Sequence, residues 1–219
     1  MNQNASGGLV PLDSDDPVVA RAAQRALARR QAVYSDEVRR LLDAGLEVMR
    51  RCGTTRTPRV ADILEAAGLS RDAFYRHFAS KEELVAAILE AGTHRLVGYL
   101  RHQMDKESDP ARQLRRWLEG IMAQAADPDV AHTTRAVVWN GGHVGDRSRP
   151  NAVAQYAPLT ELILDPVSAL GSRDPGRDGP LITYTAMGWM QLFLWRCETP
   201  SSEDIDHLVS FCMAALRPL

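Results

Sequence analysis

Three closely spaced helix starts between Thr57 and Ser80 constrain the fold of this chain more than any other feature of its sequence. Thr57 is followed by Pro58, and Ser70 and Ser80 each precede a segment of helix-forming residues. A Ser or Thr side chain caps the first free amides of a helix, and proline suits the first helical position. Gly68 lies just ahead of Ser70, where glycine commonly ends a helix. The segment therefore predicts two short helices joined by a tight turn and followed by a third helix, the helix-turn-helix pattern.

The remainder of the sequence also favours helices. Runs of β-branched residues bounded by turn residues, which are typical of strands, are nearly absent. Asp-Pro pairs at 109–110 and 127–128 predict two further helix starts, and Ser201 or Ser202 predicts the start of the last helix. We expect an all-α fold of nine to ten helices, with an N-terminal three-helix helix-turn-helix domain and a larger helical domain.

The same signals set the expected boundaries of several other elements. These are a helix from Pro17 to about Gly53 with a restart at Ser35, a helix from Ser148 to Leu170, a loop over GSRDPGRDGP, and two nearly all-apolar helices at 180–197 and 201–216.

The net charge of −2 hides an uneven distribution along the chain. Residues 1–16 carry three Asp and few apolar groups, which predicts a disordered tail. Residues 17–81 carry 13 Lys or Arg against 7 Asp or Glu, whereas residues 82–219 carry 13 against 18. A basic module ahead of an acidic remainder indicates a polyanionic partner for the first part alone. We expect domain limits of 17–80 for the helix-turn-helix domain with its Arg-rich helical lead, and 81–219 for the second domain.

The sequence also excludes several classes of protein. Its three cysteines are far apart, which favours reduced thiols over a disulfide framework or a zinc site. The N-terminus lacks the features of a signal peptide, and the most apolar segment, LITYTAMGWMQLFLWRC, is too short and polar for a membrane span. Metalloprotease, phosphate-loop and serine-hydrolase motifs are absent. We expect a cytoplasmic protein that is not an enzyme, with no cofactor, metal or membrane partner; a helical enzyme or ligand carrier is the alternative.

The stretch TPRVADILEAAGLSRDAFYRHFASKEELVAAIL resembles the DNA-binding module of the TetR family of bacterial transcriptional regulators. The resemblance covers about residues 35–90. It rests on the T-P-R opening, the D-I-x-x-x-A-G-L-S turn, the F-Y-R-H-F helix and the S-K-E-E-L cap, which occur in this order. The resemblance implies a homodimer that binds a double-stranded, palindromic operator, most often as a repressor released by a small molecule.

The residues of this module suggest individual contacts to DNA. Phe74 and Phe78 are four residues apart and should anchor the reading helix in the core. Arg71 is the candidate for a guanine edge, and Asp72 would either read a cytosine amino group or orient an arginine. The predicted DNA-binding residues are Thr57, Arg59, Ser70, Arg71, Asp72, Tyr75, Arg76, His77 and Lys81. The alternative is a helical hairpin with an ordinary polar surface.

A separate group of arginines precedes the module. Arg21, Arg25, Arg29 and Arg30 recur at roughly helical spacing. They predict either a basic arm that lies along DNA or a plain solvated helix.

The resemblance also implies roles for the second half of the chain. The helices at 180–197 and 201–216 would pair with the same helices of a second subunit, and their all-round apolar character independently demands additional burial. The middle helices would enclose a cavity for an unidentified small-molecule effector. The candidate ligand-binding residues are Trp117, Met122, Arg135, Trp139, Asn140, His143, Gln155, Tyr156 and Trp189. Each of them is alternatively an ordinary core or surface residue.

Overall fold

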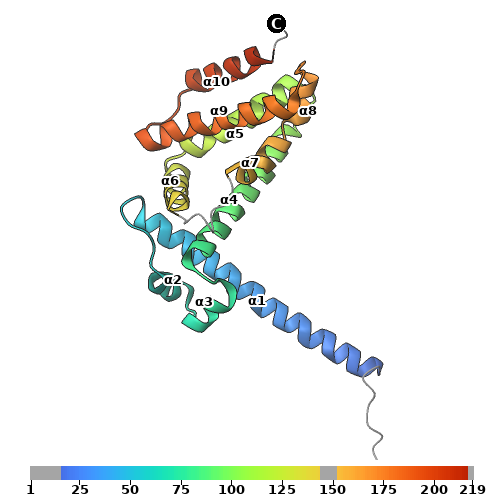
Figure 1. Ribbon diagram of the computed structural model, residues 1–219, viewed down its shortest axis with the longest axis vertical. Coiled ribbons are helices and arrows are strands. Elements are labelled where there is room, and N and C mark those ends of the chain that lie inside the picture. The colour runs from blue at the N-terminus through green and yellow to red at the C-terminus, as the bar shows by residue number, and fades with distance from the viewer. Residues whose placement is uncertain (1–15, 144–151, 217–219) are drawn as a thin grey trace, which may run out of the picture. The chain divides into compact units, whose positions relative to one another are not determined.

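A computed structural model describes residues 16–143 and 152–216 of the chain, and all but the last residue of the tail predicted at 1–16 lies outside these residues. All the regular structure within the described ranges is helical (Figure 1). The helices are α1 (Pro17–Cys52), α2 (Val60–Ala67), α3 (Arg71–His77), α4 (Lys81–Met104), α5 (Pro110–Ala126), α6 (Pro128–Gly142), α7 (Ala152–Glu161), α8 (Leu164–Ala169), α9 (Pro175–Arg196) and α10 (Ser202–Ala215). The all-α fold predicted from the sequence, with a helix-turn-helix followed by a larger helical part, is confirmed.

The chain divides into two compact units, a smaller one that ends at Arg40 and a larger one that begins at Leu41. The smaller unit contains the N-terminal part of α1, whose side chains are nearly all exposed. The larger unit contains the end of α1 and the other described helices, including both the helix-turn-helix and the ligand cavity described below. The domain limits expected from the sequence, 17–80 and 81–219, stay a prediction.

Helix α1 differs from the prediction in its middle. It runs from Pro17 to Cys52 without a break, so the predicted restart at Ser35 is wrong. The residues after Ser35 resemble a first helical turn, but Asp36 instead forms an ion pair with Arg39 on the following turn of the same helix. Such i, i+3 pairs stabilise the interior of an exposed helix. The predicted end at Gly53 is confirmed, since this residue has a φ of +57° and its amide donates to the carbonyl of Met49 at 2.9 Å.

Helix α2 begins later than predicted. The sequence suggests Thr57 as its cap and Pro58 as its first residue, but α2 starts at Val60. Arg59 occupies the cap position with extended backbone angles and no capping hydrogen bond from its side chain. The Thr-Pro pair therefore belongs to the connection that leads into α2.

Two boundaries in the second half are also wrong. The single helix predicted from Ser148 to Leu170 is two helices, α7 and α8, because the chain makes a tight turn in which the amide of Ile163 donates to the carbonyl of Thr160. Residues 148–151 of that prediction lie outside the described residues. The predicted loop GSRDPGRDGP is helical from Pro175 onward, since proline is tolerated in the first turn of a helix.

The larger unit contains two groups of buried apolar residues. One joins the end of α1 to α2, α3 and α4, with Leu41, Ile63 and Phe74 inaccessible to solvent. The helices α1 and α4 approach closely at Gly45, where an added Cβ would lie 2.7 Å from Cδ1 of Ile88. The second group joins α5 to the end of α4 and to α7–α10, and α5 and α9 lie side by side within it (Figure 1). At its centre the indole nitrogen of the fully buried Trp117 donates to a backbone carbonyl of α7 at 3.2 Å.

Candidate nucleic-acid interface and ligand cavity

The turn between α2 and α3 has the geometry that the sequence predicts. Gly68 has a φ of +61°, a left-handed conformation that favours glycine. Its amide donates to the carbonyl of Glu65 and the amide of Leu69 donates to the carbonyl of Leu64, so the last carbonyls of α2 are satisfied. Ser70 then caps α3, because its Oγ accepts a hydrogen bond from the amide of Ala73 at 3.2 Å. Three residues thus join two short helices, as in a helix-turn-helix.

Buried aromatic residues fix α3 in the core. Phe74 is fully buried and Phe78 nearly so, and their ring centroids are 5.9 Å apart. The prediction that these two side chains anchor the helix is confirmed. Ala73 is buried beside them. Because one side of α3 is packed in this way, the orientation of its other side is fixed as well.

The opposite side of α3 presents donors to solvent. Arg71, Asp72, Tyr75 and Arg76 are exposed, and His77 is half-buried. The guanidinium of Arg71 lies over the ring of Tyr75, 5.6 Å from its centroid. A cation held over an aromatic face is restricted in its motion without losing its hydrogen-bond donors. This surface therefore carries positively charged groups and a phenol, and the positions of Arg71 and Tyr75 relative to each other are restricted.

The remaining candidates for DNA contacts lie at the edges of this surface. Arg59 is exposed ahead of α2, and Thr57 is half-buried in the connection before it. Ser80 caps α4 by accepting from the amide of Glu83 at 3.2 Å, which places Lys81 in the first turn. The ammonium of Lys81 lies 3.7 Å from the carboxylate of Glu82. In the cap, the oxygen of the Ser70 hydroxyl accepts a hydrogen bond. The hydroxyl can therefore still donate its own proton to an acceptor such as a phosphate.

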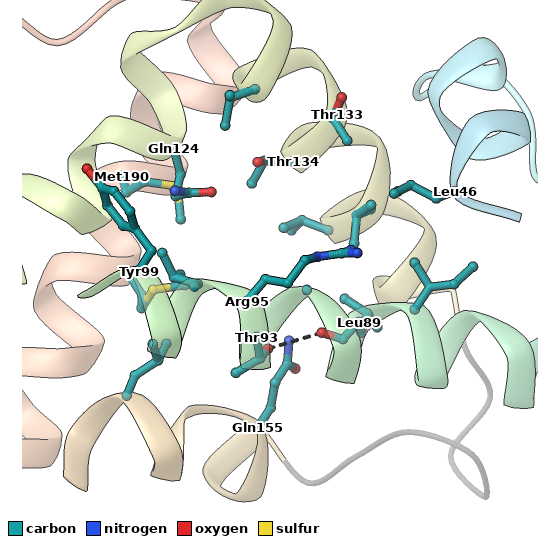
Figure 2. Close-up of a pocket in the computed structure, with 18 of the residues that line it drawn as sticks. Leu46, Leu89, Thr93, Arg95, Tyr99, Gln124, Thr133, Thr134, Gln155 and Met190 are labelled. Atoms are coloured by element: carbon teal, nitrogen blue, oxygen red, sulfur yellow. Dashed lines mark hydrogen bonds between the residues drawn. The ribbon is translucent and has the colours of Figure 1, made fainter. Parts of the chain in front are cut away.

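A cavity of about 510 Å³ lies among the helices of the larger unit (Figure 2). Most of its wall is apolar and comes from α4 and α6, with smaller contributions from α7 and α9 and with Leu46 from the end of α1. Polar groups interrupt this wall at Thr93, Arg95, Tyr99, Gln124, Asp129, Thr133, Thr134, Gln155 and Tyr156. The volume and the few polar groups are typical of a small-molecule site.

The predicted ligand-binding residues are distributed over several places. Gln155 and Tyr156 line the large cavity, and they also line an adjoining cavity of about 350 Å³ to which Trp139 and His143 contribute. Burial raises the pKa of Tyr156, and the hydrogen bond from Gln191 opposes this effect only in part. Tyr156 is therefore a neutral phenol, able to donate a hydrogen bond, at physiological pH.

The other candidates lie outside both of these cavities. Trp117 and Met122 are fully buried in the core, and the buried amide of Asn140 donates to the carbonyl of Ala136 within α6. Arg135 contacts the Sγ of Cys197. Trp189 packs edge-on against Phe193, and its buried indole nitrogen has no hydrogen-bond partner in the described chain.

Sequence reasoning missed the residues of α4 that line the cavity. Thr93, Arg95 and Tyr99 belong to its wall. In the sequence they resemble the solvent face of a long helix, and no local pattern distinguishes them from it.

Apolar side chains remain exposed on α9 and α10. On α9, Leu181, Tyr184 and Trp195 recur at helical spacing and leave 65%, 41% and 46% of their surfaces exposed. Gly188 lies in the same row, and a Cβ added there would meet no atom of the chain within 4 Å. On α10, Phe211 is 58% exposed. We call these five residues the α9–α10 apolar face.

The described residues offer neither a metal site nor a membrane span. Their His, Cys, Asp and Glu side chains form no group of three that would hold a metal ion. Across the same ranges, none of the helices combines the length and hydropathy that crossing a membrane requires.

Comparisons with known proteins agree with the geometry of α2 and α3. The sequence pattern of bacterial regulatory proteins of the tetR family matches residues 41–88, which run from the end of α1 into α4. The HTH-type transcriptional activator FasR of Mycolicibacterium smegmatis is 28% identical over 129 residues. This match covers 58% of the chain and 55% of FasR, so the chain spans about half the length of this curated relative.

Solved structures extend the likeness to most of the chain. The fatty acid degradation regulator FadR from Bacillus halodurans matches with a TM-score of 0.58 and 19% identity, over 81% of this chain and 98% of FadR. The TetR-like regulator LfrR from Mycobacterium smegmatis, in complex with proflavine, matches with a TM-score of 0.52 and 19% identity, over 84% and 98%. At this level of identity the matches establish a common fold for both the helix-turn-helix and the helices that follow it.

Proposed function

We propose that this chain, which belongs to the TetR family of bacterial regulatory proteins, acts in the cytoplasm as a dimeric transcriptional regulator whose binding to operator DNA responds to a small molecule. The observation that carries this proposal is the construction of α3. Phe74 and Phe78 fix the helix in the core, while Arg71 and Tyr75 stand exposed on its other side. A rigid helix with outward donors suits the major groove of DNA. The family is one of regulators and not of enzymes.

The roles of individual residues follow from their positions. Arg71 lies in the first turn of α3 and would read a guanine edge, since an arginine fork matches its two acceptors. Asp72 stands beside Arg71, where it would orient the guanidinium or accept from a cytosine. The groups that would contact the phosphate backbone and fix the register are Thr57, Arg59, Ser70, Tyr75, Arg76, His77 and Lys81.

The α9–α10 apolar face supports the proposal of a homodimer. Leu181 on α9 and Phe211 on α10 are more than half exposed, and exposed large apolar side chains that gather on a surface are typical of an interaction site. A two-fold axis would bring this face against itself in a second copy, and both copies would then be covered. A dimer of this kind presents two α3 helices to one operator, which implies an inverted repeat.

The cavity of about 510 Å³ supports the proposal of an effector site. Three residues separate the end of α3 from the start of α4, and the middle turns of α4 line the cavity through Gly92 and Thr93. A ligand that shifts α4 therefore also shifts α3. Coupling of this kind typically changes operator affinity by about 5- to 150-fold. The complex of LfrR with proflavine is a precedent for a bound small molecule in this fold.

We propose repression as the outcome of operator binding, because a dimer that occupies promoter DNA excludes polymerase and a ligand then releases it. FasR is by name an activator, which makes activation the second candidate. Activation requires the same DNA contacts and differs in where the operator lies. A reporter gene fused to the regulated promoter distinguishes repression from activation. Deleting the gene for this chain raises reporter output if the chain is a repressor and lowers it if the chain is an activator.

The direct experiment selects bound fragments from a random DNA pool with the purified chain. We expect an inverted repeat to be enriched, and fluorescence anisotropy should then show the chain binding this repeat far more tightly than a scrambled duplex. Equal affinity for the repeat and the scrambled duplex would contradict the proposed function.

A further inference from the structure

We propose that the cavity takes an elongated apolar molecule that carries a single anionic group, and that Arg95 pairs with this group. The inference rests on the proposed function, because it names the chemical class of the effector that the cavity would hold. It is carried by the charges in the wall, by the apolar character of the remainder and by the position of Arg95.

Only two of the described residues that line the cavity carry a charge, and they are Arg95 and Asp129. Arg95 extends from α4 into the cavity toward α6 (Figure 2). In the described part of the chain its guanidinium has neither a hydrogen bond nor an ion pair. Five donors on a fixed planar group are thus available to a ligand.

The helix that carries Asp129 offsets part of its charge. Asp129 lies in the first turn of α6, where the helix dipole favours a carboxylate. In the described residues the carboxylate of Asp129, like the guanidinium of Arg95, has no hydrogen bond or ion pair. The N-terminus of α6 offsets part of the negative charge of Asp129, so the charge of Arg95 is the less compensated of the two and favours an anionic ligand.

The other residues of the cavity wall indicate the chemistry of the part of the ligand that carries no charge. Apolar side chains that include Leu89, Leu96, Val137, Met187 and Met190 line the cavity, and apart from Arg95 and Asp129 its polar groups are neutral. Methionine side chains adapt to ligands of irregular or flexible shape. An alkyl chain with one anionic end satisfies both parts of the wall, since its tail is desolvated against the apolar residues and its head reaches Arg95.

The anionic group is a carboxylate or a phosphate, because an arginine fork binds both in the same bidentate way. The test therefore compares decanoate, decyl phosphate, decan-1-ol and decylammonium, which share one alkyl chain. Each competes against the neutral fluorescent probe N-phenyl-1-naphthylamine for the full-length chain. The relative affinities of decanoate and decyl phosphate identify which head group the site prefers.

We expect both anions to displace the probe at concentrations about tenfold lower than decan-1-ol, the effect of one charge-assisted hydrogen-bonded pair. Arg95→Gln should remove this difference and leave the affinity for decan-1-ol unchanged. Arg101→Gln, an exposed arginine of α4 outside the cavity wall, is the matched control and should behave as the wild type.

Two further outcomes are decisive. Equal displacement by anions and decan-1-ol, or strongest displacement by decylammonium, would overturn the inference while leaving the cavity as an effector site. Gly92→Leu places a side chain into the cavity, because a Cβ at Gly92 meets no atom within 4 Å. If the wild type and this variant bind the probe equally, the cavity is not the ligand site, and the effector part of the proposed function fails as well.

Discussion

The guanidinium of Arg71 lies 5.6 Å from the centroid of the Tyr75 ring, on the exposed side of α3. The ring of Tyr75 in turn meets the buried ring of Phe74 edge-on, with centroids 5.2 Å apart. The arginine is thus held by a stack that reaches into the core. A side chain arranged in this way loses less conformational entropy when it binds DNA.

The first prediction concerns this pair. Arg71→Ala should lower operator affinity by about 1–3 kcal/mol and relax the preference at one base pair, because the variant cannot form a bidentate hydrogen bond with guanine. Tyr75→Phe keeps the ring under the guanidinium and should weaken binding equally on all sequences, since only the hydrogen bond from the hydroxyl to the DNA backbone is removed. Anisotropy titrations with the operator and its single-base variants measure both effects.

Lys81→Ala provides the control for the general electrostatic contribution. It should reduce the slope of log affinity against log salt by about one unit and leave sequence preference intact. An Arg71→Ala variant that keeps both its affinity and its base preference would mean that α3 does not read the sequence.

The second prediction concerns the anchoring of α3. Phe74→Ala should lower the free energy of unfolding by about 3–5 kcal/mol, because Phe74 is fully buried and its removal leaves a cavity. Tyr75→Ala, at the adjacent and 48% exposed position, should lower it by a smaller amount, about 0.5–1.5 kcal/mol, because it removes the edge-on contact with Phe74 but leaves no buried cavity. Urea unfolding followed by circular dichroism measures both values. Equal losses for the two variants would show that the burial of α3 is wrongly assigned.

The third prediction concerns the homodimer. Gly188→Glu introduces a charge at a point where the chain itself has open space, so the protomer should fold normally while the dimer separates. Gly98→Glu on α4 is the matched control, since Gly98 is exposed and its Cβ would also meet no atom within 4 Å. Sedimentation velocity should give monomers for the first variant and dimers for the second. Dimers in both would place the interface away from the α9–α10 apolar face.

The fourth prediction concerns the basic lead. Arg21, Arg25 and Arg29 are exposed and four residues apart, and the described residues 17–35 include no acidic side chain to balance them. Replacing the three by Gln should weaken operator binding mainly at low salt, with the salt slope falling by about one unit for each phosphate that is no longer neutralised. Superimposable salt plots for the triple variant and the wild type would show that this part of α1 only faces solvent.

The fifth prediction concerns thiol reactivity and its pH dependence. Burial raises the pKa of Cys212 to about 11, whereas Cys197 is exposed at the end of α9. Iodoacetamide should therefore modify Cys197 first in the native chain at pH 8, and Cys197→Ser should remove the fast phase, because the thiolate is the reactive form. Mass spectrometry of the modified peptides reports the order. Early labelling of Cys212 would contradict its burial.

Much of the fold could be predicted from the sequence, because most helix ends depend on local chemistry. Gly53, Gly68 and the capping residues Ser70, Ser80 and Asp109 all act as their residue types suggest. The restart at Ser35 was wrong because a capping residue inside a long exposed helix looks the same in sequence as one at a helix start. The turn between α7 and α8 has no glycine, but an Asp-Pro pair at 165–166 lies in the first turn of α8 and is a signal of the kind that marks the starts of α5 and α6.

The candidate sites were predictable to different extents. The reading helix is short, and its buried and exposed residues alternate at helical spacing, so Phe74 and Arg71 could be assigned to opposite sides from the sequence. The cavity depends on how several helices meet, which no local pattern reveals. Trp117, which the sequence suggests as a cavity residue, is part of the core, whereas Arg95, an exposed residue on α4, lines the cavity.

The most direct test of the central claim is selection of bound sequences from a random DNA pool by the wild-type chain and by Arg71→Ala in parallel. We predict that the wild type enriches an inverted repeat whose half-sites lie about 10 base pairs apart, or a multiple of this spacing, because two α3 helices must enter the major groove on one face of the duplex. Arg71→Ala should lose the preference at one position of each half-site. A wild-type pool with no enriched sequence would contradict the claim that this chain is an operator-binding regulator.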